Sequence, residues 1–226
     1  MTTKRIPNKN TAVVILAAGG SDRRWPGGDA KHLLQVLGMT IIERVIHMTR
    51  LYGHEPTVMT HRPDITAACR KLGVVVVDPE QRHAMLNTFL SARHLWKWRT
   101  VALYGDVLFW PPTLQGILKW DESPWHFWGC RAQLFGMAFT DPERTEQRTR
   151  QFMEEYPEKK MWRLIHLYQW LEGYQVGKYT PNKNHTLVGI SPSRDVWTRD
   201  VDKMQEYTDL LVILKSLKDF DPWRDQ

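Results

Sequence analysis

The chain has 226 residues, of which 42% are hydrophobic and 25% are charged, and its formal net charge is +6. This length and composition are typical of one large globular domain, and no apolar run approaches the ~18 residues of a membrane-spanning helix. We therefore expect a single domain over residues 1–226 without a membrane span, in which residues 1–10 form a loose leader. The only cysteines, Cys69 and Cys130, are far apart, which argues against a disulfide framework or a cysteine zinc site and favours a cytoplasmic setting.

Apolar runs alternate with segments of helical periodicity along the first 120 residues. A continuous apolar run at residues 11–17 predicts a buried strand. The remaining elements predicted in this half are strands at 57–60, 74–77 and 100–104, and helices at 41–52, 63–72, 86–97 and 111–118. Alternation of this kind favours right-handed βαβ units and a mostly parallel sheet.

The second half continues without a composition typical of a linker. Its predicted strands are 125–130, 134–140 and 187–190, and its predicted helices are 143–156, 160–172 and 206–218. We therefore predict an α/β fold, Rossmann-like, with a mixed, mostly parallel sheet and helices on both faces. Ligands bind such sheets at the carboxyl ends of the strands, near a switch in strand order. Three segments fall at or near such ends: 19–31, 105–106 and 200–202.

The first of these segments belongs to the glycine-rich stretch LAAGGSDRRWPGGDAKHLLQVLG, residues 16–38. Glycines allow a ligand to approach the backbone closely, and backbone N–H groups attract phosphate. The stretch matches neither the ATPase P-loop nor G-x-G-x-x-G. From the residues alone, a phosphate-binding loop and an ordinary strand-to-loop corner both remain open.

This stretch resembles the signature of the nucleotidyltransferases that activate sugar phosphates and phosphocholine, of the MobA-like NTP transferase type. That signature reads roughly L-A-A-G-x-G-x-R, followed some eight residues on by P-K. The matching positions are Leu16, Ala17, Ala18, Gly19, Arg23 and Lys31. Ser21 stands at the second motif glycine, and Ala30 replaces the proline before Lys31.

Two later segments extend the resemblance. The segment MLNTFLSARHLWKWRTVALYGDVLF is similar to the middle of the phosphocholine and sugar-phosphate members, which implies that Asp106, after Gly105, binds a divalent metal. WTRDVDKMQEYTDLL resembles the family segment D-[IV]-D-T-P-E-D-L, which implies that Asp202 is the second metal-binding carboxylate. Without the resemblance, Asp106 reads as a turn residue and Asp202 as part of the acidic start of a C-terminal helix.

The resemblance implies Mg²⁺-dependent transfer of a nucleotidyl group from an NTP to a phosphorylated small molecule, with release of pyrophosphate. The expected acceptor is a sugar 1-phosphate or a phosphocholine-like compound. Asp106 and Asp202 would hold Mg²⁺, Arg23 would contact the β- and γ-phosphates, and Lys31 would stabilise charge near the α-phosphate. The nucleotide-binding residues expected are Leu16, Ala17, Ala18, Gly19, Gly20, Ser21 and Gly105. The attacking phosphate is already ionised near neutral pH, so no catalytic base is required.

In this family the segment between the third strand and the following helix usually reads the nucleobase. Gln81 and Asn87 occupy that segment, and each can donate and accept hydrogen bonds. They could equally cap the helix. The histidines form no metal-binding pattern, and His32 is interpreted as a surface or helix residue.

Two other functions are compatible with the sequence. A glycosyltransferase would use Asp200 and Asp202 as a metal-binding D-x-D, and a non-catalytic nucleotide-binding module would explain Ser21, Ala30 and the Lys203-Met204 departure from threonine-proline. The hypothesis of a nucleic-acid partner is supported only by the net charge and the number of tryptophans, and we do not expect such a partner. The sequence leaves open whether the chain forms a homo-oligomer.

Overall fold

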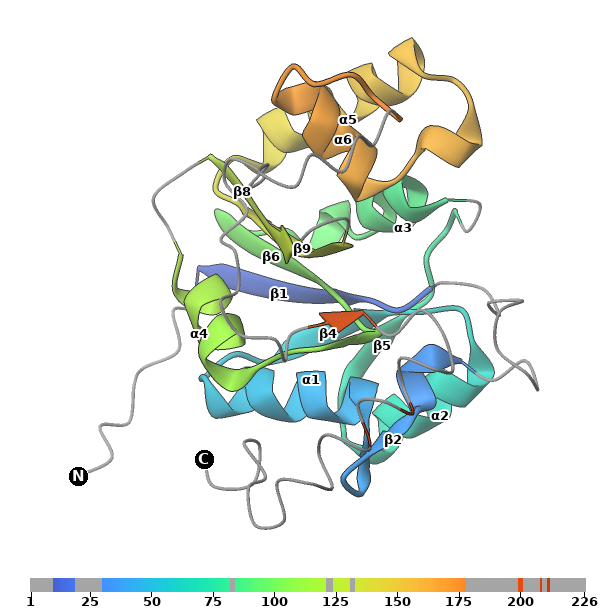
Figure 1. Cartoon of the computed structure of the whole chain (residues 1–226), viewed down its shortest axis with the longest axis vertical. Coiled ribbons are helices and arrows are strands. Elements are labelled where there is room, and N and C mark those ends of the chain that lie inside the picture. Colours follow the sequence, from blue (N-terminus) through green and yellow to red (C-terminus); the bar gives the residue numbers. More distant parts are fainter. Residues whose placement is uncertain are drawn as a thin grey trace.

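The computed structural model describes residues 10–18, 30–81, 84–120, 124–130, 133–177 and 199–200, together with 208 and 211. Its centre is a six-stranded sheet with the strand order β5-β4-β1-β6-β9-β8 (Figure 1). The strands are β1 (Thr11–Leu16), β4 (Pro56–Met59), β5 (Val75–Val77), β6 (Arg99–Tyr104), β8 (Trp125–Cys130) and β9 (Gln133–Phe139). The first four of these are parallel, and β9 is antiparallel to both β6 and β8. The predicted α/β fold with a mixed, mostly parallel sheet is confirmed.

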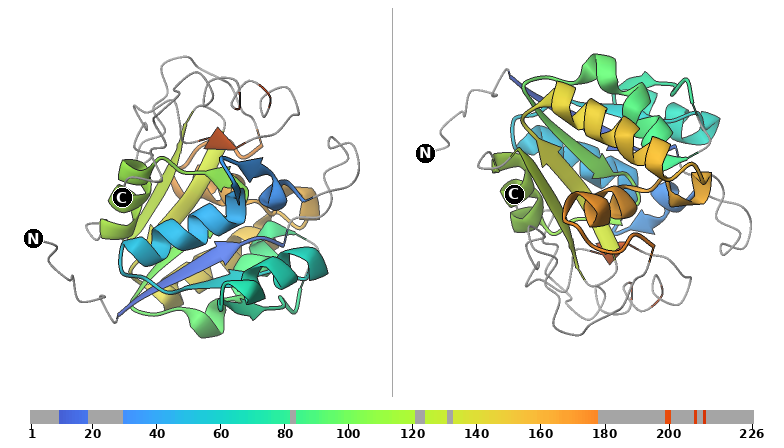
Figure 2. Two further views of the ribbon diagram at one scale, coloured as in Figure 1. Left: turned by 90° about the horizontal axis from the view of Figure 1, so that it is seen from below. Right: turned by 90° about the horizontal axis from the view of Figure 1, so that it is seen from above.

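Helices cover both faces of the sheet. One face carries α1 (Ile41–Leu51), α2 (Pro63–Lys71) and α4 (Pro111–Lys119) (Figure 1). The other carries α3 (Met85–Ser91), α5 (Pro142–Glu155) and α6 (Leu164–Leu171); Figure 2 shows α1 in front from below, and α5 with α6 in front from above.

The alternation of side chains along β1 explains why both faces are covered. Val13 and Ile15 belong to the hydrophobic cluster on the α1 face, whereas Val14 and Leu16 belong to the cluster on the α3 face. Because every second side chain of a strand points to the same face, a continuous apolar run needs apolar partners on both sides.

Short elements complete the described fold. Two-residue strands pair as β2 (Gln35–Val36) with β3 (Met39–Thr40), and as β7 (Val107–Leu108) with β10 (Arg199–Asp200). The β3 strand leads directly into α1, where Thr40 and Glu43 form a reciprocal capping box that satisfies backbone donors at the helix start. None of the helices in the described part of the chain is long and apolar enough to cross a membrane.

Two predicted helices are shorter than expected. The helix expected over 86–97 ends at Ser91 and is followed by a 3₁₀ turn, Arg93–Leu95. The chain leaves helical geometry at Trp96, whose ring packs 4.7 Å from that of Phe89 and 4.8 Å from that of Phe139. Similarly, the segment 160–172 is divided at Trp162, where a 3₁₀ turn ends before α6 begins. The strand expected at 187–190 and most of the helix expected at 206–218 lie outside the described residues.

Candidate active site

The order of the strands changes direction between β1 and β6. From β1 the chain adds β4 and then β5 on one side, and it returns with β6 on the other side of β1. The connections after β1 and β6 therefore leave the carboxyl edge in opposite directions, and open α/β sheets bind ligands in the crevice at such a point. The sheet topology places this crevice directly after Leu16 and Tyr104.

Small residues allow the backbone segments after β1 and β6 to approach closely. The Gly105 N–H donates to the Leu16 carbonyl at 3.0 Å, and the Ala17 N–H donates to the Met59 carbonyl at 2.9 Å. A Cβ at position 105 would lie 3.0 Å from His32 Cδ2, 3.0 Å from Ile42 Cδ1 and 3.1 Å from Ala17 Cβ. A side chain at position 105 would force these neighbours to move.

Lys31 and His32 reach the crevice from a 3₁₀ helix, Lys31–Leu33, which precedes the β2–β3 hairpin. Their exposed fractions are only 8% and 5%. His32 is therefore a buried residue of a short helix, so that of the two interpretations of His32, surface or helix residue, the helical one is confirmed. Its Nδ1 atom has no hydrogen-bond partner in the described structure.

Charged groups from three connections converge on His32. Burial is the main cause that lowers the pKa of this imidazole, and the positive charges of Arg62 and Lys31 lower it further. The carboxylates of Asp106 and Asp64 oppose this shift. His32 is thus held neutral, while its charged neighbours come from the connections that follow β1, β4 and β6.

Arg62 and Asp64 did not enter the prediction from the sequence. They form an ion pair of 2.6 Å just after β4, and the Arg62 N–H donates to the Thr60 hydroxyl at 3.1 Å. The signal that could have found them is a basic residue directly after a strand that was predicted to end at residue 60. Because the crevice also involves the end of β4, such a residue is a candidate for contacting an anionic ligand.

Asp106 occupies the turn between β6 and β7 and is partly buried. The following strand, β7, pairs with β10, so that Arg199 lies opposite Leu108 and Asp200 lies opposite Val107. Segments more than ninety residues apart in the sequence thus lie side by side next to Asp106. Asp202 itself is outside the described residues.

The other predicted site residues divide into two groups. Leu16, Ala17 and Gly105 lie at the crevice, and Ala18 follows them with a partly buried side chain. Four predicted site residues of the glycine-rich loop are outside the described part of the chain: Gly19, Gly20, Ser21 and Arg23.

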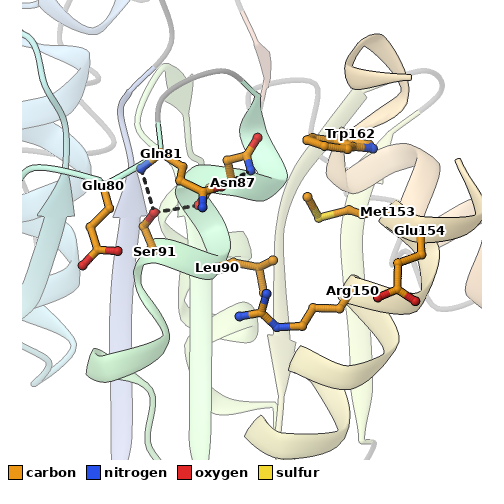
Figure 3. Close-up of a pocket in the computed structure, with 9 residues that line it drawn as sticks. All are labelled: Glu80, Gln81, Asn87, Leu90, Ser91, Arg150, Met153, Glu154 and Trp162. Atoms are coloured by element: carbon orange, nitrogen blue, oxygen red, sulfur yellow. Dashed lines mark hydrogen bonds between the residues drawn. The ribbon is translucent and has the colours of Figure 1, made fainter. Parts of the chain in front are cut away.

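Gln81 and Asn87 meet in a pocket of about 330 Å³ between α3 and α5 (Figure 3). The Asn87 side-chain Nδ2 donates to Gln81 Oε1 at 2.6 Å. The residues that line the pocket are Glu80, Gln81, Asn87, Leu90, Ser91, Arg150, Met153, Glu154 and Trp162. The alternative role as a helix cap does not hold, because the residue that caps α3 is Ala84 and no side chain caps this helix.

The described residues contain no group of three or more histidine, cysteine or acidic side chains able to hold a metal ion. Near phosphates, Mg²⁺ prefers one or two carboxylates completed by phosphate oxygens and water. Asp106 provides one such carboxylate at the crevice, and its chemistry fits this ion.

Several solved structures match nearly the whole chain. Their fold, that of the nucleotide-diphospho-sugar transferases, is also the fold of this chain. The CTP:phosphocholine cytidylyltransferase of Streptococcus pneumoniae is 16% identical with a TM-score of 0.56, and the match covers 91% of this chain and 99% of that one. A putative glucose-1-phosphate thymidylyltransferase of Bacillus anthracis is 12% identical with a TM-score of 0.63, covering 94% and 98%. The inositol-1-phosphate CTP transferase of T. maritima is 14% identical with a TM-score of 0.61, covering 91% and 96%.

Residues 13–120 match the family model of the MobA-like NTP transferase domain. The matched segment extends from β1 to Trp120 and contains Lys31, Gly105 and Asp106. No curated protein matches the chain in a sequence search. The resemblance to nucleotidyltransferases is confirmed over this segment, and the three solved structures described above are nucleotidyltransferases by name.

Proposed function

We propose that this protein is a Mg²⁺-dependent nucleotidyltransferase that transfers a nucleotidyl group from an NTP to a phosphorylated small molecule and releases pyrophosphate. The observation that carries the proposal is the convergence of Lys31, Arg62 and Asp106 around the crevice between β1 and β6, within the segment that matches the NTP transferase family. Cations and a carboxylate at a switch point suit a metal-bound triphosphate.

In this proposal the crevice works by positioning and charge neutralisation. The backbone of residues 16–21 and Gly105 binds the nucleotide, Arg23 contacts the β- and γ-phosphates, and Lys31 stabilises charge at the α-phosphate during in-line attack. Asp106 and Asp202 hold Mg²⁺, which neutralises the charge of the triphosphate. The pairing of Asp200 with Val107, beside Asp106 and two residues before Asp202, supports this pair of ligands.

The acceptor in this proposal is a phosphorylated polyol or amino alcohol, such as a sugar 1-phosphate or a phosphocholine-like compound. Its phosphate oxygen attacks the α-phosphate, so the bond to pyrophosphate breaks as the new phosphoanhydride forms. The names of the structural neighbours support this class of acceptor. We place the reaction in the cytoplasm, in keeping with the widely separated cysteines, of which Cys69 is a free thiol buried in the core.

The test measures pyrophosphate release from each of the four NTPs with a panel of phosphorylated acceptors and Mg²⁺. We expect Asp106→Asn to lower turnover by about a hundredfold, as is typical for the loss of a charged contact to the transition state. Asp141→Asn is the matched control, because asparagine can still cap α5 at that position while the same charge is removed.

Unchanged turnover in Asp106→Asn would contradict the metal role. A glycosyltransferase would consume a nucleotide sugar without releasing pyrophosphate, and a non-catalytic module would bind the NTP without turnover, so the same assay separates both alternatives from the proposed reaction.

A further inference from the structure

The pocket between α3 and α5 extends along α3, where Asn87, Leu90 and Ser91 line it. The Leu86 N–H at the start of α3 donates to the Trp162 carbonyl at 3.2 Å, which brings the rim of the pocket to the segment before α6. One wall is formed by Glu80, Gln81 and α3, and the other by α5 and Trp162 (Figure 3). A volume of about 330 Å³ is at the lower end of the range for small-molecule sites.

Most hydrogen-bond donors on these walls already have acceptors within the protein. Asn87 Nδ2 donates to Gln81 Oε1, and the Ser91 hydroxyl donates to the Asn87 carbonyl at 2.8 Å. The Arg150 guanidinium donates to Glu146 at 2.8 and 3.0 Å. Trp162 Nε1 donates to the Tyr156 carbonyl at 2.7 Å, so the indole contributes its ring face.

Acceptors on the same walls remain unused. Asn87 is 5% exposed, and its Oδ1 atom has no hydrogen-bond partner in the described structure. A buried carbonyl oxygen without a partner costs free energy, which a bound donor would recover. The Glu80 and Glu154 carboxylates also line the pocket, and neither has a hydrogen bond or ion pair among the described residues.

We infer that this pocket selects a nucleobase with an exocyclic amino group, that is cytosine, adenine or guanine, over uracil or thymine. The inference rests on the proposed function, which supplies the NTP. Three acceptor groups favour a ligand edge rich in N–H donors, and the Gln81 amide nitrogen remains to donate to a ring nitrogen or carbonyl of the base. The carboxylates repel the carbonyls of uracil, which unlike guanine has no exocyclic amino group to present to them instead, and the face of Trp162 offers a stacking surface that accepts any base.

The experiment measures equilibrium binding of nucleotides to the full chain by calorimetry, with Mg²⁺ and without acceptor. Matched pairs test the amino group: GTP against ITP removes it, whereas CTP against UTP and ATP against ITP replace it with a carbonyl. We expect the best-bound nucleotide to lose about tenfold or more in affinity when its amino group is absent, because a site built around a donor rejects the analogue that lacks it.

Glu80→Gln and Glu154→Gln keep the side-chain size and remove the charge. We expect one or both to reduce the preference within the matched pair severalfold while UTP affinity stays within about twofold. Glu172→Gln removes an exposed carboxylate that does not line the pocket and should leave the preference unchanged.

Tightest binding of UTP or dTTP, or affinities equal within about twofold across all nucleotides, would overturn the inference and leave nucleotidyl transfer standing. A preference that neither substitution alters would also overturn the assignment to this pocket. Failure of every NTP to bind would instead overturn the proposed function itself.

Discussion

At the scale of single residues, Gly105 is required because of packing. Its backbone lies outside the left-handed region, yet a Cβ there would come within 3.0 to 3.1 Å of His32, Ile42 and Ala17. Ile42 and Ala17 belong to the hydrophobic core, and neither is exposed to solvent. They cannot move aside without disturbing the contact between β1, β6 and α1.

Gly105→Ala should therefore lower the free energy of unfolding by about 1–3 kcal/mol, the usual cost of overpacking a core. Gly116 is the matched control: it lies inside α4 with open space around its Cα, and alanine has the better helix propensity. Gly116→Ala should raise the free energy of unfolding by up to about 1 kcal/mol. Urea denaturation of both variants checks these opposite signs, and equal effects would argue against tight packing at position 105.

At the scale of elements, the β2–β3 hairpin joins Lys31–Leu33 to α1. Its two central residues, Leu37 and Gly38, have φ values of 49° and 83°. The Arg44 side chain on α1 holds this turn by donating to the Val36 carbonyl at 2.8 Å and to the Leu37 carbonyl at 2.9 Å. Hairpin turns of this kind favour asparagine or glycine at the first central position, so Leu37 is strained there.

Leu37→Asn should raise the free energy of unfolding by up to about 1 kcal/mol, since asparagine tolerates a positive φ, and the apolar area that Leu37 buries at 39% exposure offsets part of this gain. Met39 is similarly exposed, at 41%, but it lies in strand β3 and its φ is not positive. Met39→Asn should give no stabilisation. A stabilisation of equal size in both variants, measured by chemical denaturation, would show that exposure and not backbone strain is responsible.

A second element-scale feature joins strand β8 to the end of α4: the rings of His126 and Trp128 on β8 pack with that of Trp120, which follows α4. The His126 ring centroid lies 4.2 Å from that of Trp120 and 4.3 Å from that of Trp128. Burial between these rings lowers the pKa of His126 to about 4. The imidazole is consequently neutral in the folded protein over the whole physiological range.

This shift predicts a stability that depends on pH. Between pH 6.5, the ordinary histidine pKa, and pH 4, position 126 binds a proton in the unfolded chain but not in the folded one. The contribution of neutral His126 to the free energy of unfolding is therefore fully present above pH 6.5 and declines as the pH falls. His126→Phe keeps an aromatic ring and should make this decline shallower. Urea midpoints from pH 4 to 8 test it; the slope that remains belongs in part to His32 and His54, whose pKa values burial also lowers. An identical slope in the variant would refute the role of His126.

At the scale of the whole molecule, the proposed ligand joins elements that are far apart in sequence. A nucleotide in the crevice would connect the ends of β1, β4 and β6, and a base in the pocket would add α3 and α5. A ligand that binds only the folded state stabilises it by about 2.7 kcal/mol at a hundredfold excess over Kd. Unfolding should then become more cooperative across both faces of the sheet.

We therefore expect the thermal midpoint to rise with at least one NTP, and to rise further when Mg²⁺ is present. In Asp106→Asn the additional shift from Mg²⁺ should disappear, while a shift from the nucleotide alone persists because Lys31 and the backbone of the crevice remain. A shift that is the same with and without Mg²⁺ in the unsubstituted protein would contradict the metal dependence.

The order of amino acids was sufficient for the main α/β architecture, since apolar runs and helical periodicity are local properties. The boundaries of β1, α1, α2 and α4 agree with the prediction to within one or two residues. The parallel arrangement of the early strands also implied a common carboxyl edge, and we therefore predicted that residues 17, 31, 105 and 106 belong to a single ligand site.

Three features needed the folded chain: the burial of His32, the ion pair of Arg62 with Asp64, and the pocket that α5 completes with Glu154. Each depends on which side chains from distant segments come into contact, and a pattern along the sequence carries no information about such contacts. Side chains become buried and acquire charged neighbours only when the helices pack onto the sheet. The tertiary structure therefore decided the charge environment of the crevice and the polarity of the pocket.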